Sequence, residues 1–165
     1  LMKTIILVFI TTLCVQLSQA QETSLDIENF AFLDETEWEG ELMYRNYSDF
    51  KKETIPATLA VETRKNGLFL RFEYPEEPKA NFKKLFRFDA KAQTFGGKTI
   101  TEISKVAEDH WKIKTTSRGN DNDMPAEFRE TYDVSKDKMV ITKEVLLDGK
   151  SDSFVRNQYT FTPKN

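Results

Sequence analysis

Hydrophobic and polar residues alternate with a period of two over most of the chain beyond residue 37. The clearest case is Trp38–Tyr47, in which Gly40, Leu42 and Tyr44 share one face with Trp38. A period of two is typical of a β-strand that buries one face. The same alternation predicts strands at 38–47, 55–63, 68–74, 82–89, 99–106, 111–115, 128–134, 139–147 and 154–162.

Turn signals separate these segments. Asn66-Gly67 is the strongest hairpin signal, because both residues accept a positive φ angle. Gly96-Gly97 and Asp148-Gly149 mark further turns, and the polar segment 118–125 indicates a hairpin loop. About nine strands at intervals of roughly ten residues, joined by short turns, predict an all-β fold, an up-and-down antiparallel β-barrel.

Residues 21–33 start polar and then carry apolar residues at the spacing of one or two helical turns. Ser24 or Asp26 is placed to cap the N-terminus of such a helix. The spacing therefore predicts a short helix that plugs one end of the barrel. Its apolar positions are Leu25, Ile27, Phe30 and Leu33.

The first 20 residues have the pattern of an export signal. Lys3 supplies a positive charge, and an apolar run follows at 5–15. Ser18 and Ala20 are the small residues that a signal peptidase reads. Polar residues interrupt the run before it reaches the roughly 20 apolar residues that a membrane span needs. We expect a signal peptide cleaved after Ala20, and a secreted or periplasmic protein without a stable membrane anchor.

Cleavage of 20 of the 165 residues leaves 145, residues 21–165, which suffice for one domain with its own core. Because Lys3 is the only charged residue removed, 23 basic and 27 acidic residues remain, for a net charge of −4. This acidity argues against nucleic acid and anionic membrane surfaces as partners. Cys14 leaves with the signal, so no disulfide, thiol nucleophile or cysteine metal site is expected.

Two motifs carry a resemblance to a known family. Phe32-Leu33, a polar spacer, Trp38-x-Gly40 and an aromatic strand end resemble the opening segment of lipocalin-like barrels. The last strand, 156–161 (RNQYTF), is similar to the closing strand of such proteins. In strand number and order the chain most resembles small secreted bacterial members of the calycin group, including the nitrobindin-like proteins. The resemblance implies that Trp38 and Gly40 close the barrel.

The chain departs from this family pattern in two respects. Lipocalins carry Gly-x-Trp, whereas the order here is Trp38-x-Gly40. Nitrobindin-like proteins bind haem through a histidine late in the barrel, and the only histidine here is His110, before Trp111. Haem binding is therefore not implied, and no cofactor is expected.

Thirteen Phe, five Tyr and two Trp have two competing interpretations. They line a cavity for an apolar ligand, or they fill a small barrel completely. The resemblance favours a partial cavity, because calycin-type barrels usually keep one. The residues expected to line the lumen are Tyr44, Leu59, Leu70, Phe72, Phe86, Phe88, Glu130, Tyr132, Asn157 and Tyr159.

Glu130 is the most informative of these residues. The period of two places it inside together with Tyr132, where a carboxylate needs a donor such as Lys84 or Lys143. There it would orient the polar end of a ligand or act as an acid with a raised pKa. The alternative is that a bulge turns Glu130 outward or that it meets water at the barrel mouth. We favour this alternative, because bulges are common at barrel rims.

Other candidate chemistry is weak. His110 beside Asp109 indicates an exposed turn, since no second histidine or activated serine accompanies it. Asp121-Asn122-Asp123 offers oxygen ligands for calcium but lacks the glycine and distal glutamate of a dedicated loop, so no metal is expected.

Three functions follow, in this order. The first is a carrier that holds a small hydrophobic or amphipathic ligand, oriented by Glu130, Tyr132 and Asn157. The second is a non-catalytic interaction module with a filled barrel, whose protein partner the sequence does not name. The third is a hydrolase or isomerase that uses Glu130, and it ranks last because no catalytic constellation is visible.

Overall fold

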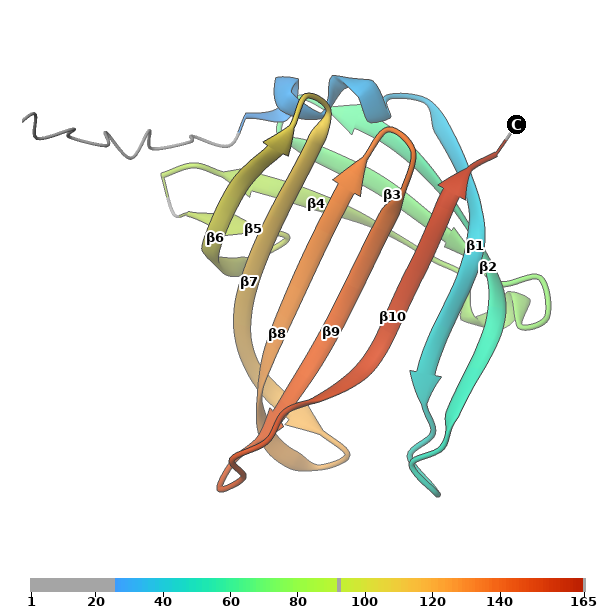
Figure 1. Cartoon of the computed structure of the whole chain (residues 1–165), viewed down its shortest axis with the longest axis vertical. Helices are drawn as coiled ribbons and strands as arrows, with labels where there is room; N and C mark the ends of the chain where they lie inside the picture. Colours follow the sequence, from blue (N-terminus) through green and yellow to red (C-terminus); the bar gives the residue numbers. More distant parts are fainter. Residues whose placement is uncertain (1–25, 92, 165) are drawn as a thin grey trace, which may run out of the picture.

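A computed structural model of the protein describes residues 26–91 and 93–164. Ten strands form one closed antiparallel barrel, in which each strand pairs with its neighbours in sequence and β1 pairs with β10 (Figure 1). The prediction of an all-β, up-and-down barrel is confirmed. The predicted export signal at 1–20, and the helix positions Ser24 and Leu25, lie outside the described residues.

The strands are β1 (Thr36–Arg45), β2 (Lys52–Arg64), β3 (Gly67–Glu73), β4 (Phe82–Asp89), β5 (Thr94–Phe95), β6 (Lys98–Ala107), β7 (His110–Asp121), β8 (Met124–Ser135), β9 (Met139–Leu147) and β10 (Phe154–Pro163). Two 3-10 helices, η1 (Ile27–Leu33) and η2 (Pro78–Ala80), accompany them. Within the described ranges, no helix has the length and apolar character needed to cross a membrane.

The strand count is ten instead of nine because of β5. It contains only Thr94 and Phe95, which pair with the end of β4 and the start of β6. A segment of two residues is too short to show an alternating pattern. This strand is therefore recognised only from its pairing with β4 and β6.

The polar segment 118–125 is not the loop that its composition predicts. β7 continues to Asp121 and β8 begins at Met124, which leaves a turn of Asn122 and Asp123. These two residues have φ angles of 50° and 63°. Asn and Asp tolerate this left-handed conformation better than other side chains, and two such residues suit a tight hairpin.

The hairpin predicted at Asn66-Gly67 is present, but for a different reason. Neither residue adopts a positive φ, and Gly67 is already the first residue of β3. A Cβ atom at Gly67 would lie 2.2 Å from the backbone oxygen of Phe86. The glycine is therefore required by the close approach of β3 and β4.

Gly40 has the same role where the barrel closes. It pairs with Phe161 of β10, and a Cβ atom there would lie 2.0 Å from the backbone oxygen of Thr160. A larger residue at this position would push β1 away from β10.

Helix η1 covers one end of the barrel (Figure 1). Asp26 caps it, because its side chain accepts a hydrogen bond from the Glu28 amide (3.3 Å) while its own amide donates to Asn29 Oδ1 (3.0 Å). Phe30 of the helix is buried and stacks on Phe88 at 5.3 Å between ring centroids. The predicted plug is present, as a 3-10 helix.

Trp38 anchors the chain as it leaves this plug. Its indole Nε1 donates to Thr36 Oγ1 (2.9 Å), and that hydroxyl donates to the Leu33 carbonyl (2.7 Å). Both Trp38 and Leu33 are fully buried. A buried indole needs a partner for its N–H, and the Thr36 hydroxyl supplies it.

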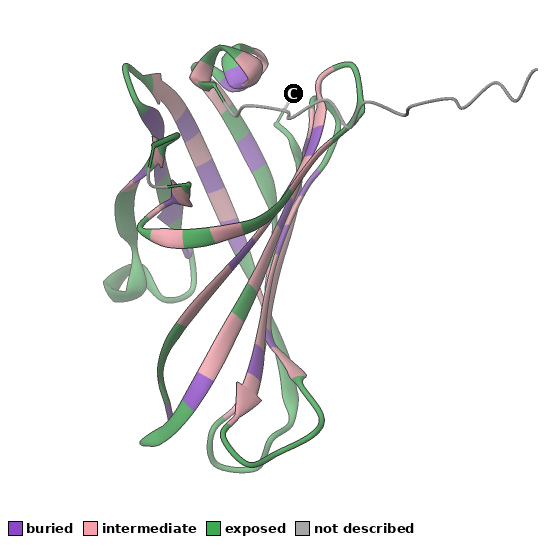
Figure 2. Ribbon diagram, turned by 90° about the vertical axis from the view of Figure 1, so that its left-hand side faces the viewer, coloured by how far each residue is buried: buried purple, intermediate pink, exposed green. Residues whose placement is uncertain are grey.

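Buried and accessible residues alternate along the strands, as Figure 2 shows. We call the half of the lumen next to η1 the filled half, because its inward side chains are almost all buried in one cluster. Complete filling therefore describes this half of the barrel. Its members include Leu59, Leu68, Phe86, Phe95, Trp111, Val134, Met139 and Phe161.

Candidate functional site

The other half of the lumen, which we call the open half, lies at the end opposite η1 (Figure 1). Part of its inward surface stays accessible to solvent, although Phe72 and Tyr132 are buried there. Phe82 stacks on Phe72 at 4.6 Å between centroids, yet is 42% exposed. At the mouth, β1, the β1–β2 turn, β9 and β10 border an open pocket of about 460 Å³. Its walls include Tyr44, Lys143 and Asn157.

Other hollows lack this construction. The hollow of about 610 Å³ beside the β3–β4 loop is lined by residues 76–80 of that loop alone. Another, of about 190 Å³, lies beside β1, β2 and β3 and includes the polar residues Glu37, Arg71 and Lys164. The wall of the pocket at the mouth includes inward-facing side chains of β1, β9 and β10, so we take it as the candidate site.

Glu130 faces the interior deeper in the open half. The register of β8 runs without a shift from Thr115 on one side of Glu130 to Lys143 on the other. The Glu130 side chain is 12% exposed, and its Oε2 atom accepts hydrogen bonds from Lys98 Nζ and the Tyr132 hydroxyl. The expectation that a bulge or bulk water accommodates Glu130 is wrong.

We call Lys98, Glu130 and Tyr132 the lumenal polar cluster. Lys98 was absent from the partners predicted for Glu130, which were Lys84 and Lys143. It lies on β6, separated from β8 by β7, so the contact crosses the interior. Extending the alternation of β6 back from Ile100 would have placed Lys98 on the inner face.

Burial controls protonation in this cluster. It lowers the pKa of the Lys98 amine, and the Glu130 carboxylate offsets this only in part. The positive charges of Lys84 and Lys143 lower the pKa of Lys98 further. Burial and the Glu130 charge raise the pKa of Tyr132 far above its ordinary value of 10. The Tyr132 phenol thus stays protonated and donates to Glu130.

A second polar contact crosses the interior beside the cluster. The hydroxyl groups of Tyr74 and Tyr159 lie 2.6 Å apart, although β3 and β10 are separated by β1 and β2. Burial, followed by the hydrogen bond with Tyr74, raises the pKa of Tyr159. The two rings therefore present neutral hydroxyls to the lumen.

Thr115 carries an unused hydroxyl in the same region. It is 2% exposed and pairs across the strands with Glu130, which places it on the inner face. Within the described residues, its Oγ1 atom has no hydrogen-bond partner of good geometry. A buried unsatisfied hydroxyl costs about 1–3 kcal/mol, and such a group in a native structure calls for an explanation.

The residues predicted to line the lumen fall into two groups. Leu59, Leu70, Phe86 and Phe88 belong to the hydrophobic core, where they contact other side chains and not free space. The open half brings together Tyr44, Phe72, Glu130, Tyr132, Asn157 and Tyr159, of which Phe72 and Tyr132 are also buried members of the core. Sequence periodicity identifies the inner face correctly but does not distinguish the two halves.

A further cluster at the mouth escaped the sequence analysis. A bulge in β10 between Val155 and Asn157 turns Arg156 inward. The Arg156 Nε atom donates to Asp121 Oδ1 (3.1 Å), and its Nη2 atom contacts Oδ2. The guanidinium also lies 4.2 Å from the Tyr47 ring centroid. We call these residues, together with Phe154, the mouth cluster.

The mouth cluster joins three segments and forms part of the pocket wall. Tyr47 lies in the β1–β2 turn, and its hydroxyl donates to Asp121 Oδ1 at 3.1 Å. Arg156 and Tyr47 both line the pocket. The Asp121 carboxylate, considered above as a calcium ligand, instead accepts hydrogen bonds from Arg156 and Tyr47. Nowhere in residues 26–91 or 93–164 do three His, Cys, Asp or Glu side chains gather as a metal site.

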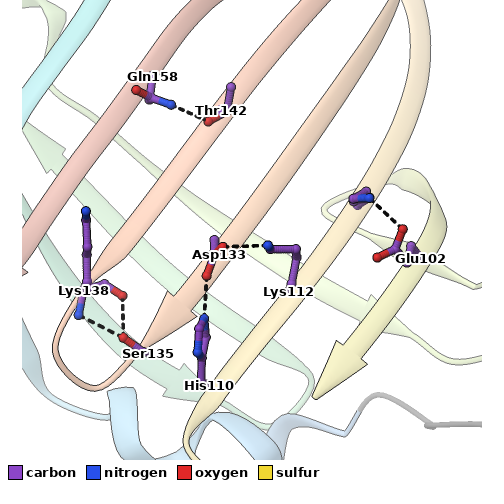
Figure 3. A network of polar contacts seen from close by, with 9 residues as sticks. Glu102, His110, Lys112, Asp133, Ser135, Lys138, Thr142 and Gln158 are labelled. Carbon is purple, nitrogen blue, oxygen red and sulfur yellow. Dashed lines mark hydrogen bonds and ion pairs between the residues drawn. The ribbon is translucent and has the colours of Figure 1, made fainter. Parts of the chain in front are cut away.

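His110 is part of a polar network on the outer face, as Figure 3 shows. Its Nε2 atom lies 2.6 Å from Asp133 Oδ1, and Lys112 Nζ lies 3.0 Å from Asp133 Oδ2. Burial raises the pKa of Asp133, but the hydrogen bonds from His110 and Lys112 outweigh this and leave it lowered. The expectation of an exposed turn residue was wrong: His110 begins β7 and is paired.

No protein-family model matches this chain, and no curated protein is significantly similar to it. The closed antiparallel barrel is consistent with a calycin-like fold. Functional inference therefore depends on the geometry of the open half.

Proposed function

We propose that this protein is an exported, lipocalin-like carrier that binds a small hydrophobic or amphipathic molecule in the open half of its barrel. One observation carries the proposal: the inward side chains of Tyr44, Lys143 and Asn157 are partly accessible and border a pocket of about 460 Å³. Small-molecule sites typically have volumes of about 300–1,000 Å³. The filled half limits the ligand to the outer part of the lumen.

The walls of the open half suit a molecule with one apolar and one polar end. Phe82 and Tyr159, which pack on the buried Phe72, supply aromatic surface. Burial of about 200 Å² of apolar ligand surface would contribute roughly 5 kcal/mol before the costs of association. Tyr44 and Asn157, at the mouth, supply hydrogen-bonding groups for the polar end.

The test is binding of N-phenyl-1-naphthylamine, a neutral fluorescent probe of apolar sites, to the protein expressed from the full-length chain. Asn157→Trp places an indole in the pocket and should abolish the fluorescence increase. Gln158→Trp is the matched control, because Gln158 is the next residue of β10 and donates to Thr142 on the outer face (Figure 3).

The proposal requires binding by the native protein and by Gln158→Trp. No fluorescence increase with the native protein, or an equal increase with Asn157→Trp, would rule out the open half as the binding site. Circular dichroism of both variants verifies that the barrel is retained.

A further inference from the structure

Three lysines project from the inner face of the open half. Lys98 is paired with Glu130. Lys84 and Lys143 share the inner face, because they lie opposite Leu70 and Glu130 in the strand register. In the described part of the chain, neither ammonium forms an ion pair with a carboxylate.

Aromatic rings are the close partners of these two lysines. Lys143 Nζ lies 3.9 Å from the Phe128 ring centroid, and Lys84 Nζ lies 5.1 Å from that of Phe86. A ring face attracts a cation but leaves its charge uncompensated. Both ammonium groups are thus held along the inner wall with their charge available.

The acidic groups near this space are already engaged. Glu130 is bonded by Lys98 and Tyr132, as described above. Asp121 is bonded by Arg156. Glu53, at the exposed rim, accepts hydrogen bonds from the Tyr44 hydroxyl (2.8 Å) and the Asn46 amide (3.1 Å). The inner wall therefore carries an excess of positive charge, although the whole chain has a net charge of −3.

We propose that the ligand is an amphipathic anion, whose negatively charged head, in the simplest case a carboxylate, contacts Lys84 and Lys143 while its apolar tail lies against the aromatic wall. This inference rests on the proposed function, because it specifies the chemistry of the ligand in the same lumen. The observation behind it is the uncompensated charge of Lys84 and Lys143, which a carrier of neutral ligands would not need.

Two independent features of the site agree with an anionic head. The Thr115 hydroxyl is buried, faces the lumen and has no hydrogen-bond partner by distance and angle, although it interacts with the Tyr132 hydroxyl, and such a group suits an acceptor oxygen. In addition, the positive charges of Lys84 and Lys143 add a smaller contribution to burial in lowering the pKa of Lys98. An anion between them would relieve this repulsion among like charges.

The experiment compares two ligands that differ only at the head. Dodecanoate and dodecanol compete with N-phenyl-1-naphthylamine for the native protein at low salt, and the ratio of their affinities is measured. We expect dodecanoate to bind about tenfold more tightly. Lys84→Gln and Lys143→Gln should each reduce this ratio several-fold. Lys83→Gln is the matched control, since Lys83 is adjacent on β4 but lies on the outer face opposite Arg71.

The outcomes separate the two proposals. Equal displacement of the probe by dodecanoate and dodecanol overturns the anionic ligand and leaves the carrier function intact. A preference for dodecanoate that persists in the Lys84→Gln/Lys143→Gln double variant also overturns it. Absence of probe binding to the native protein refutes the carrier function itself.

Discussion

The mouth cluster provides the sharpest test of the energetics of this barrel. Arg156 and Asp121 form an ion pair in which the side chains are 6% and 3% exposed. Removal of one partner leaves the other charge buried without compensation, whereas removal of both avoids this penalty. We therefore compare Arg156→Met, Asp121→Leu and the double variant.

The structure sets the expected magnitudes. Each single substitution should lower the free energy of unfolding by about 3–5 kcal/mol, as is typical of a broken buried ion pair. The double variant should lie within about 1.5 kcal/mol of the native protein, because Met and Leu fill similar volumes in contact with Tyr47 and Phe154. The two sites are then coupled by several kcal/mol.

Urea unfolding, followed by tryptophan fluorescence, measures these differences. Trp38 and Trp111 are buried in the filled half, so the signal reports on the barrel far from the substitutions. Arg118→Met is the control, because Arg118 pairs with Asp148 on the surface and should change stability by about 1 kcal/mol or less. Additive losses in the double variant would refute the reasoning.

Three further predictions concern other parts of the molecule. Gly40→Ala should destabilise the barrel by about 1–3 kcal/mol, because its Cβ atom would meet the Thr160 carbonyl; an unchanged urea midpoint would contradict this. The pKa of Asp133 is lowered in the folded protein, so its pairing stabilises the fold above the ordinary value of 3.8 and is lost as pH falls through the lower folded value. Asp133→Asn should therefore lower the urea midpoint at neutral pH and not in strong acid, and an equal difference at both pH values would contradict this assignment. Mass spectrometry of the exported protein should show a chain that begins at Gln21, and a mass that includes residues 1–20 would exclude the predicted cleavage.

Local sequence determined the strands and the inner face of the barrel. The alternation from Trp38 to Tyr44 and from Glu130 to Tyr132 is a property of neighbouring residues, because successive side chains of a strand point to opposite faces. The same rule places Glu130 on the inner face, as observed. The competing expectation, that a bulge at the barrel rim turns Glu130 outward, is wrong, because the strand register shows no shift there.

Tertiary structure decided which side chains each inward residue contacts. Lys98 reaches Glu130 across a strand, and the β10 bulge turns Arg156 toward Asp121, 35 residues away in sequence. These contacts depend on strand register and barrel closure, which the two-residue period does not encode. The same holds for the division into a filled and an open half. A period of two is identical along the whole length of a strand, so it does not show which inward positions are covered by other side chains.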